Sequence, residues 1–507
     1  MDGNENALCS GGSRGTNSGL RRGKAADILQ SKLCFGRERR SGVKLQEFTF
    51  ESLSAAYRQK KVSPVEVAKE TLAQTRRLNS VLNAVYFLDD DTTLAKARES
   101  EQRYALNSAL GLMDGAVTTM KDALPVIGMP TYRGTASTPD EGLYYRWNAP
   151  VTDRLLEAGV VIAGKNTMCD FGIIASGVSS RFGITRNPWN PQLTPGASSS
   201  GAAASVAAGL CIAAVGTDIV GSIRVPASYC GLVGLKPSYG RVPYYPPVSP
   251  ALVAGPMARN MHDLAIMLDA LAQPDSRDFT ALAVQNVSYA NTLNERAKNP
   301  VFGLLESVGF GVPPDPEVVA ATRRAAALFE AQGARVEQVS MPQFDPADLL
   351  LVEKFYRART YAELNTAPLD HQKKSAFMFE WAGPAKDDSA ELMWQAMNAI
   401  VRLREQTMAL MQGVNYLLLP ATPTTAFKAE DVAPKGYTLF DAWCNTFLFN
   451  LTEQPALSIC SGLSSNAVPI GLQIVGRRFD DMGVMQMGRW YETLRDLPDR
   501  WAPWGLS

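Results

Sequence analysis

The chain has 507 residues, and its 50 basic and 50 acidic side chains give a formal net charge of zero. This balance lacks the surplus of positive charge that is typical of proteins that bind nucleic acid or anionic membranes, and it argues against both kinds of partner. Hydrophobic residues make up 46% and charged residues 20% of the chain, the composition of a globular protein. Only two residues are histidine, so a histidine-rich metal site is not expected.

The seven cysteines are widely spaced, odd in number and without a C-x-x-C pair. This distribution favours free thiols over a disulfide framework or a zinc knuckle. The N-terminus has no apolar segment of the kind found in secretory signals, and we expect a cytoplasmic protein. The apolar segment 201–216 has 16 residues, fewer than the roughly 18 to 20 that span a bilayer. It predicts a buried helix followed by a buried strand.

Residues 1–45 are rich in glycine, serine, asparagine and arginine and have no hydrophobic periodicity. We predict a flexible tail there and a single domain over residues 46–507, because no low-complexity linker follows. The first strong helix signal is a capping box, in which Ser63 caps the helix, Pro64 opens it and Glu66 returns a hydrogen bond.

Strands and helices alternate over the rest of the chain, since short apolar runs predict strands and amphipathic stretches predict helices. The expected strands are residues 116–121, 160–163, 301–305 and 416–419, and the expected helices are residues 151–158, ending at Gly159, and 315–332. Residues 340–412 are expected to be helical, either as core packing or as a roof over a pocket. Such alternation indicates an α/β fold.

One motif misleads. The segment from Gly159 to Lys165 is nearly a phosphate-binding loop. Such a loop needs a curled backbone whose N–H groups converge on the phosphates, whereas the interior here, Val-Val-Ile-Ala, favours a straight strand. Asn166 also stands where the loop requires a hydroxyl. We therefore reject a nucleotide-binding function.

Three segments together could perform acyl transfer. Lys121 ends an apolar strand, a serine run occupies residues 195–201, and a glycine-rich turn occupies residues 216–224. Burial can lower the pKa of a lysine enough to make it a base, and a serine activated by a base becomes a nucleophile. Successive backbone N–H groups in a tight turn can hold an oxyanion. Each segment alone also has an ordinary structural explanation, as a surface lysine, a helix cap and a tight connection.

In combination and order, the segments resemble the amidase signature family of serine hydrolases. That family's central block is close to PGASSSGAAASVAAG and GTDIVGSIRVPA in this chain. The similarity extends over residues 50–490, with further matches at MKDALPVIGMP, GKNTMCDFG, CGLVGLKPSYGRV and LLLPATPT. The resemblance implies an α/β fold with a large twisted mixed β-sheet covered on both faces by helices.

The resemblance also implies a role for individual residues. Lys121 matches the general base, Ser198 matches a relay serine held by a cis peptide bond, and Ser222 matches the acylated nucleophile. Ser198 and Ser222 lie 24 positions apart, the family's spacing. The implied oxyanion hole consists of the backbone N–H groups of Ile219, Val220, Gly221 and Ser222. Asp218 and Arg224 match charged residues that support the turn.

The acyl pocket implied by the resemblance lies at Gly172, Ile173, Ile174 and Ala175, which are small or apolar. Aromatic residues close to Lys121 in the sequence, among them Tyr132, Tyr144, Tyr145 and Trp147, are further candidates for the pocket.

The chain departs from the family pattern at Ala197, Ser200 and Ala202. Val220 also stands in place of a glycine. A β-branched residue avoids positive φ, so Val220 should adopt ordinary backbone angles, and its side chain should narrow the pocket. None of these changes removes a catalytic side chain, so they concern substrate preference more than activity.

The resulting hypothesis is an amidohydrolase that cleaves a small carboxylic amide, with hydrophobic or aryl amides, esters and carbamates as candidate substrates. The reaction requires neither a metal nor an organic cofactor. Two alternatives stay open: the glutamine-hydrolysing subunit of a tRNA-dependent amidotransferase, and a non-catalytic relative that binds a small molecule. A homodimer is a further open alternative for the oligomeric state.

Overall fold

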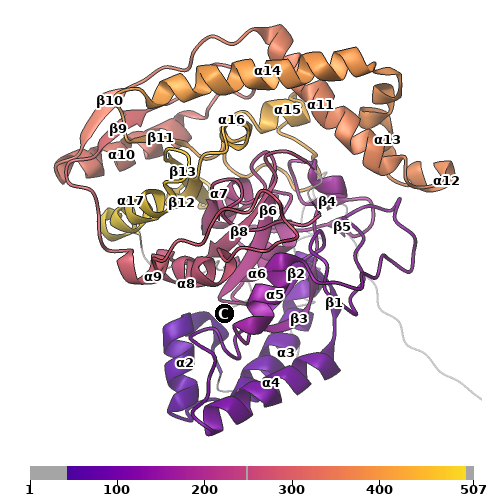
Figure 1. Cartoon of the computed structure of the whole chain (residues 1–507), viewed down its shortest axis with the longest axis vertical. Helices are drawn as coiled ribbons and strands as arrows, with labels where there is room; N and C mark the ends of the chain where they lie inside the picture. The colour runs from indigo at the N-terminus through magenta and orange to yellow at the C-terminus, as the bar shows by residue number, and fades with distance from the viewer. Residues whose placement is uncertain (1–42, 247–248, 498–507) are drawn as a thin grey trace, which may run out of the picture. The chain divides into compact units, whose positions relative to one another are not determined.

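The computed structural model describes residues 43–246 and 249–497 (Figure 1). These residues belong to one compact unit that begins at Val43. The expected flexible tail, residues 1–45, lies outside the described residues except for its last three. No helix in the described part of the chain is long and apolar enough to cross a membrane.

An eight-stranded mixed sheet is the centre of the fold. Its first three strands run parallel to one another, and every later neighbour is antiparallel. In spatial order the strands are β10 (Arg335–Gln338), β9 (Val301–Leu304), β11 (Tyr416–Pro420), β13 (Pro469–Val475), β12 (Ala456–Leu463), β7 (Val233–Lys236), β8 (Val253–Ala258) and β6 (Ala213–Asp218).

Helices cover both faces of this sheet, as the alternation of side chains along β11 shows. Leu418 packs in the core cluster of α8 (Met261–Leu271), α10 (Pro316–Ala331) and α17 (Asp481–Leu494). Its neighbours Leu417 and Leu419 pack on the opposite face with Phe449 of α16 (Phe447–Leu451). Because successive side chains of a strand point to opposite faces, a fully buried strand such as β11 needs cover on both sides.

A separate three-stranded sheet carries the first half of the candidate site. Its order is β1 (Val85–Leu88), β3 (Val161–Asn166) and β2 (Val117–Lys121). The hydroxyl of Thr118 in β2 donates to the carbonyl of Ala213 in β6 at 2.9 Å, which joins the two sheets side by side. The helices of this region are α2 (Phe50–Arg58), α3 (Pro64–Leu82), α4 (Asp90–Ala105) and α5 (Pro150–Glu157), and β4 (Val178–Ser179) pairs with β5 (Gly183–Ile184).

Local sequence signals correspond closely to these elements. Ser63 and Glu66 form the expected capping box at the start of α3. Gly159 follows α5 with a φ of 79°, a left-handed conformation that favours glycine. The apolar segment 201–216 contains most of α6 (Ser200–Ala207) and the start of β6, and every residue of both elements is buried.

Residues 340–412 are mostly helical, as expected (Figure 1). The segment contains α11 (Pro346–Leu364), α12 (Leu369–Gln372), α13 (Ala376–Ala382) and α14 (Ala390–Met408), followed by the 3-10 turn η4 (Ala409–Met411). Val352 and Tyr356 of α11 pack in one core cluster with Ile174, Val220 and Trp443. This helical segment therefore packs directly against the elements of the candidate site.

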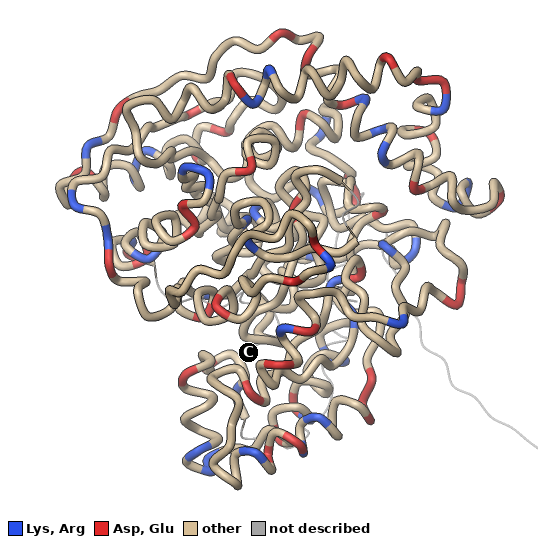
Figure 2. The backbone as a smooth tube through the Cα atoms, in the orientation of Figure 1, with Lys and Arg blue, Asp and Glu red and all other residues tan. Residues whose placement is uncertain are grey.

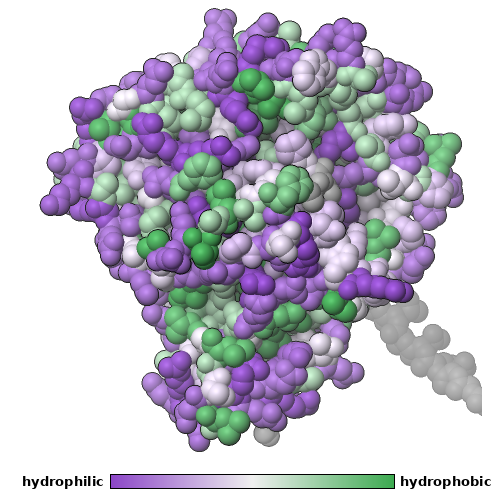
Figure 3. Space-filling model, viewed as in Figure 1, coloured by the Kyte–Doolittle hydropathy of each residue, from purple (hydrophilic) through white to green (hydrophobic). Residues whose placement is uncertain are grey.

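The remaining short elements are α7 (Arg224–Cys230), α9 (Tyr289–Thr292), α15 (Leu439–Ala442), η1 (Leu45–Glu47), η2 (Asp170–Gly172) and η3 (Gly383–Asp387). Basic and acidic residues are interspersed along the chain (Figure 2). Hydrophilic and hydrophobic residues are likewise mixed on the face that Figure 3 shows. The interspersed basic and acidic residues fit the zero net charge of the sequence.

Candidate active site

Lys121 lies at the end of β2, and its side chain is completely buried. Its Nζ is 2.8 Å from the Oγ of Ser198, 2.9 Å from the Oγ of Ser199 and 2.8 Å from the Oγ1 of Thr217. The structure thus brings together Lys121 and Ser198, two residues that the sequence analysis selected. It adds Ser199 and Thr217, which we had not assigned a role although both lie within the quoted motifs.

The environment of Lys121 changes its acidity. Burial lowers the pKa of its ammonium to about 7, although Cys169, Asp218 and Asp122 act in the opposite direction. A buried site disfavours the charged form of an amine, because the surroundings solvate it less well than water does. At neutral pH a substantial fraction of Lys121 is therefore uncharged and able to accept a proton.

The serine run reaches the site through an unusual backbone path. Gly196 has a φ of 78°, and the peptide bond between Ala197 and Ser198 is cis. A Cβ on Gly196 would come within 2.9 Å of the Cα of Pro226 in α7, so only glycine allows the chain to approach α7 this closely. The backbone N–H of Ser199 then donates to the carbonyl of Ser222 at 3.3 Å, which links the serine run to the glycine-rich turn.

The glycine-rich turn connects β6 to α7 and contains Ser222, whose side chain faces the cavity described below. Gly221 has a φ of 130°, and a Cβ there would overlap with the hydroxyl of Thr446. The N–H of Gly221 donates to the Oδ1 of Asp218 at 2.7 Å. Within the described residues, the N–H groups of Ile219, Val220 and Ser222 have no hydrogen-bond partner. Of the four N–H groups expected to form the oxyanion hole, three are therefore without a partner and one is bonded to Asp218.

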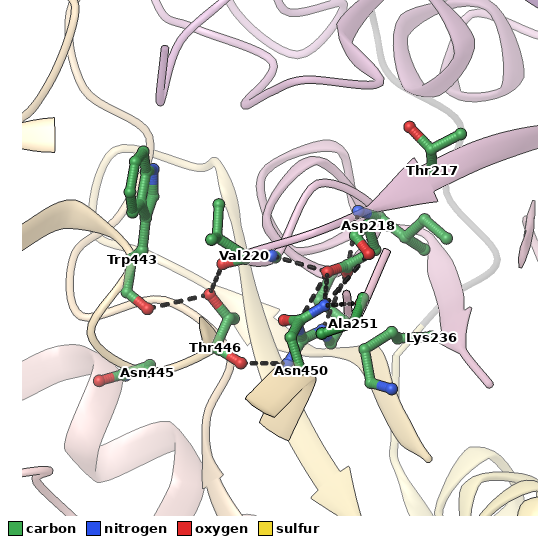
Figure 4. Close-up of polar contacts among 12 residues, drawn as sticks. Thr217, Asp218, Val220, Lys236, Ala251, Trp443, Asn445, Thr446 and Asn450 are labelled. Atoms are coloured by element: carbon green, nitrogen blue, oxygen red, sulfur yellow. Dashed lines mark hydrogen bonds and ion pairs between the residues drawn. The ribbon is translucent and has the colours of Figure 1, made fainter. Parts of the chain in front are cut away.

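A buried ion pair supports this turn from behind. Arg224 contacts the carboxylate of Asp218 through Nε at 3.0 Å and Nη2 at 2.9 Å, and both side chains are inaccessible to solvent. Burial alone would raise the pKa of Asp218, but Arg224 and the amide of Asn450 hold it well below its usual range. Asn450 donates to Asp218 at 2.9 Å (Figure 4). Asp218 is therefore a fixed anion that orients the turn.

Thr446 holds the same turn from the other side. Its hydroxyl contacts the carbonyl oxygens of Val220 and Trp443 (Figure 4). Its own carbonyl accepts from Arg224 at 2.9 Å. The segment that contains Trp443 and Thr446 therefore connects the turn to the wall of the cavity.

Most side chains that line the cavity beside Ser222 are apolar. Of the four residues expected to form the acyl pocket, Ile174 and Ala175 line it. Ile173 is buried in the neighbouring core cluster, and Gly172 lies against Ser198, because a Cβ there would be 3.2 Å from the Oγ of Ser198. The remaining lining residues are Ala197, Val220, Gly221, Ser222, Val225, Tyr229, Phe427, Ala442 and Trp443.

Three features of the lining bear on the sequence analysis. Val220 faces the cavity and is not among the residues with positive φ, as its β-branched side chain requires. The aromatic residues near Lys121 in the sequence are not part of the lining. Tyr132 instead packs on Tyr86 and Phe182, with ring centroids 5.6 and 5.8 Å apart. Tyr229, Phe427 and Trp443, the large aromatic residues of the lining, were not identified from the sequence.

The segment that resembled a phosphate loop is a straight strand, as its apolar interior indicated. Residues 161–166 form β3, and the Nζ of Lys165 donates to the carbonyl of Leu124 at 2.6 Å. Within residues 43–246 and 249–497, no group of three or more histidine, cysteine, aspartate or glutamate side chains is placed to hold a metal ion.

Comparison with known proteins adds independent evidence. A family model described as Amidase matches residues 66–485. The chain is 33% identical over 462 residues to the A subunit of the glutamyl-tRNA(Gln) amidotransferase of Synechococcus sp. (strain CC9605), a match that covers 85% of this chain and 93% of the relative. The corresponding protein from Neisseria meningitidis serogroup C (strain 053442) is 32% identical over 471 residues, 87% of this chain and 96% of the relative.

Solved structures of similar fold include several small-molecule hydrolases. An amidase of known crystal structure is 27% identical with a TM-score of 0.77, and the match covers 88% of this chain and 99% of the amidase. A 6-aminohexanoate cyclic dimer hydrolase is 25% identical with a TM-score of 0.78, and the match covers 91% of this chain and 99% of the hydrolase. A bacterial aryl acylamidase of the amidase signature family is 24% identical and shares the fold with a TM-score of 0.82. The match covers 88% of this chain and 96% of the acylamidase. The chain therefore belongs to the amidase signature family, whose members are hydrolases that act on carbon–nitrogen bonds.

Proposed function

We propose that this protein hydrolyses small carboxylic amides through an acyl-enzyme formed on Ser222. The observation that carries the proposal is the fully buried Lys121 amine 2.8 Å from the hydroxyl of Ser198, on a serine run that is hydrogen-bonded to Ser222 through the backbone of Ser199. A buried amine with a pKa of about 7 suits general-base catalysis, because such a base works best when its pKa lies near the operating pH.

In the proposed reaction, neutral Lys121 takes a proton from Ser198, and Ser198 takes the proton of Ser222. The oxygen of Ser222 attacks the substrate carbonyl, and the carbon–nitrogen bond breaks as the proton returns through Ser198 to the departing amine. Water then enters, loses a proton along the same path and cleaves the ester of Ser222, which releases the carboxylic acid. Dividing the reaction in this way replaces one difficult step by two easier ones.

The negative charge that develops on the carbonyl oxygen needs hydrogen-bond donors already in place. The N–H groups of Ile219, Val220 and Ser222 are the donors we assign, since none of them has another partner in the described structure. The N–H of Gly221 is bonded to Asp218, so we assign it the role of fixing the shape of the turn.

The substrate we propose has an uncharged, apolar acyl group. The cavity beside Ser222 is lined by eleven residues, none of which has a charged side chain. Apolar groups gain free energy when they leave water for such a lining, about 25 cal/mol for each Å² buried. We therefore expect hydrophobic and aryl amides to be the preferred substrates, and esters and carbamates of similar shape to be cleaved as well.

The second candidate is hydrolysis of glutamine within an amidotransferase complex, because the curated relatives described above are amidotransferase subunits. Glutamine has an ammonium and a carboxylate group, and burying either without a charged partner is costly. Because none of the side chains that line the cavity is charged, the cavity favours an uncharged amide over glutamine.

A panel of purified substrates tests the proposal. Aryl, alkyl and carboxyl-bearing amides should be hydrolysed at different rates by the wild-type chain, and Ser222→Ala should hydrolyse none of them. A fluorophosphonate probe should label the wild-type protein but not the Ser222→Ala variant, which separates an enzyme from a relative that only binds small molecules. Ammonia release from glutamine, together with no turnover of the other amides, would support the second candidate instead.

A further inference from the structure

A network of hydroxyl groups surrounds the carboxylate of Asp170, the first residue of the turn η2. The Asp170 side chain is buried. Its Oδ2 accepts from the backbone N–H of Ser180 at 2.7 Å, and its Oδ1 accepts from the hydroxyl of Ser180. The Oγ of Ser180 is 2.9 Å from the Oγ of Ser375, which is 2.5 Å from the Oγ1 of Thr135. Three segments that are distant in the sequence thus meet around one carboxylate.

The network compensates the charge that Asp170 brings into the protein. A buried anion destabilises the fold unless hydrogen-bond donors replace the water it has lost. Burial raises the pKa of Asp170, and hydrogen bonds from Ser180, Ser375 and Thr135 act in the opposite direction. A buried polar network whose members all have partners is rigid. This network is therefore suited to hold η2 in a single conformation.

The backbone of η2 needs such a restraint. Phe171 has a φ of 49° and Gly172 has a φ of 76°. This left-handed region is ordinary for glycine but unfavourable for phenylalanine, and a residue stays in it only where the surroundings impose it. The carbonyl of Asp170 accepts from the N–H of Ile173 at 3.1 Å, which closes the turn. Asp170 thus anchors the turn through both its side chain and its main chain.

The residues that follow Asp170 reach the candidate active site at two places. A Cβ on Gly172 would be 3.2 Å from the Oγ of Ser198, so the turn packs directly against that serine. Ile174 and Ala175 line the cavity beside Ser222. The same short segment is therefore a wall of the cavity and a support for Ser198.

The network also connects this wall to two other parts of the fold. Ser375 is buried and immediately precedes α13, within the helical segment 340–412. Thr135 is buried in the loop that follows β2, the strand that ends at Lys121. The cavity wall, this loop and α13 are held together around Asp170.

We propose that Asp170 is a positioning residue for amide hydrolysis, which fixes the wall so that Ser198 keeps its place and the acyl group packs against Ile174 and Ala175. This inference rests on the proposed function. Asp170 does not itself line the cavity, so it acts through the wall and not by contact with the substrate. In Asp170→Asn, an NH₂ group replaces one of the two oxygens that accept from Ser180, and the network loses a hydrogen bond.

Two amides of different length test this role. Hexanamide and acetamide both release ammonia, which can be quantified, and only the hexanoyl chain is long enough to pack along the wall. Asp170→Asn should lower kcat for hexanamide by about 10- to 100-fold, the range expected for hydrogen bonds to a charged group. The preference in kcat/KM for hexanamide over acetamide should fall by about fourfold, the contribution of one buried methylene group.

The measurement distinguishes positioning from a loss of folded protein. Titration with a fluorophosphonate probe gives the concentration of functional active sites, so that kcat is expressed per site. A variant that is only less stable has fewer sites, but its kcat per site and its preference for hexanamide stay at the wild-type values. Both quantities should change in Asp170→Asn.

Further variants sharpen the test. Ser180→Ala removes one hydroxyl, keeps the backbone N–H and should cause a smaller loss in the same direction, whereas Ser180→Thr should retain most of kcat. Asp278→Asn is the matched control, because Asp278 is also buried and accepts from the N–H of Tyr244 at 2.9 Å and the hydroxyl of Thr280 at 2.7 Å. Asp278 does not line the cavity, and its variant should keep the wild-type kcat and preference. If Asp170→Asn does not fold, Ser180→Ala replaces it.

The outcomes separate this inference from the proposed function. A wild-type kcat per site in Asp170→Asn, or an unchanged preference for hexanamide, would overturn the inference and leave amide hydrolysis intact. An equal fall in preference in Asp278→Asn would also overturn it, because the effect would not be specific to this network. Cleavage of neither amide by wild-type protein whose Ser222 is labelled would overturn the inference alone. Absence of both labelling and cleavage would overturn the proposed function and the inference with it.

Discussion

The hydroxyl of Thr446 contacts the carbonyl of Val220, two residues before Ser222 and far away in the sequence. The peptide unit between Val220 and Gly221 is thereby held at both ends, since its N–H donates to Asp218. This arrangement fixes the turn whose remaining N–H groups we assign to the oxyanion. Thr446 is accordingly a positioning residue, which affects the reaction through the turn and not by contact with the substrate.

Thr446→Val should lower kcat by about fivefold and change KM little, because the loss of one hydrogen bond, worth roughly 1 kcal/mol, misplaces donors needed only in the transition state. Thr446→Ser keeps the hydroxyl and should restore most of kcat. Thr407→Val is the control, since Thr407 is a buried threonine that donates to a backbone carbonyl within α14. Equal kcat values in Thr446→Val and the wild type would contradict the assigned role.

The pH dependence of catalysis should reflect Lys121. With a pKa of about 7, its amine loses its proton as the pH rises through 7, so kcat/KM should increase through this range and level off above pH 8. Lys121→Ala should lower kcat/KM by about 10² to 10⁴, the usual contribution of a general base. Steady-state kinetics between pH 5.5 and 9.5 provides the measurement.

A second lysine provides the control for that experiment. Lys165 is also buried, and burial lowers its pKa to about 8, but its Nζ donates to the carbonyl of Leu124. Lys165→Met should keep the wild-type midpoint in the pH profile of kcat/KM. A midpoint that moves in Lys165→Met, or a rise with pH that persists in Lys121→Ala, would show that another group is the base.

The same lysine links stability to pH. The pKa of Lys121 falls from 10.5 to about 7 on folding, so between these pH values the unfolded chain binds more protons than the folded one. The free energy of unfolding should therefore increase as the pH rises from 7 towards 10. Lys121→Met should make this increase smaller, as measured by urea denaturation at several pH values. An identical slope in both proteins would argue against a depressed pKa.

Val220 should limit the size of the acyl group, because its side chain lines the cavity beside Ser222. Val220→Ala removes two methyl carbons and should increase kcat/KM for branched or aryl acyl groups relative to a linear hexanoyl group. Val414→Ala is the control, because Val414 is buried in a different core cluster and does not line the cavity, and it should leave this preference unchanged. Unaltered relative rates in Val220→Ala would place the acyl group elsewhere.

The sequence alone was sufficient to predict the position of residues whose conformation depends on local backbone shape. Lys121 ends a strand, Ser198 follows Gly196, and Ser222 lies in a turn that requires glycine at Gly221. In each case the neighbouring residues of the motif determine the backbone conformation, so recognising the motif also predicts the local geometry. The mixed sheet and its helical cover were also expected, because strand and helix signals alternate along the chain and the motifs resemble those of one family.

The sequence was not sufficient where contacts join distant segments. Trp443 and Phe427 line the cavity more than 200 residues after Ser222, and neither lies in a recognisable motif. The pairing of Arg133 with Glu363 likewise depends on the packing of α11 against the loop after β2. Such contacts are decided by tertiary packing, to which hydrophobic periodicity and short motifs are insensitive.

Direct observation of the acyl-enzyme is the most decisive test of the account. Wild-type protein mixed rapidly with an excess of an activated hexanoyl ester, then quenched in acid and digested, should give one hexanoyl adduct on the peptide that contains Ser222. The same treatment of Ser222→Ala should give none. An adduct on Ser198 or Ser199 instead, or full turnover by Ser222→Ala, would contradict the assignment of Ser222 as the nucleophile.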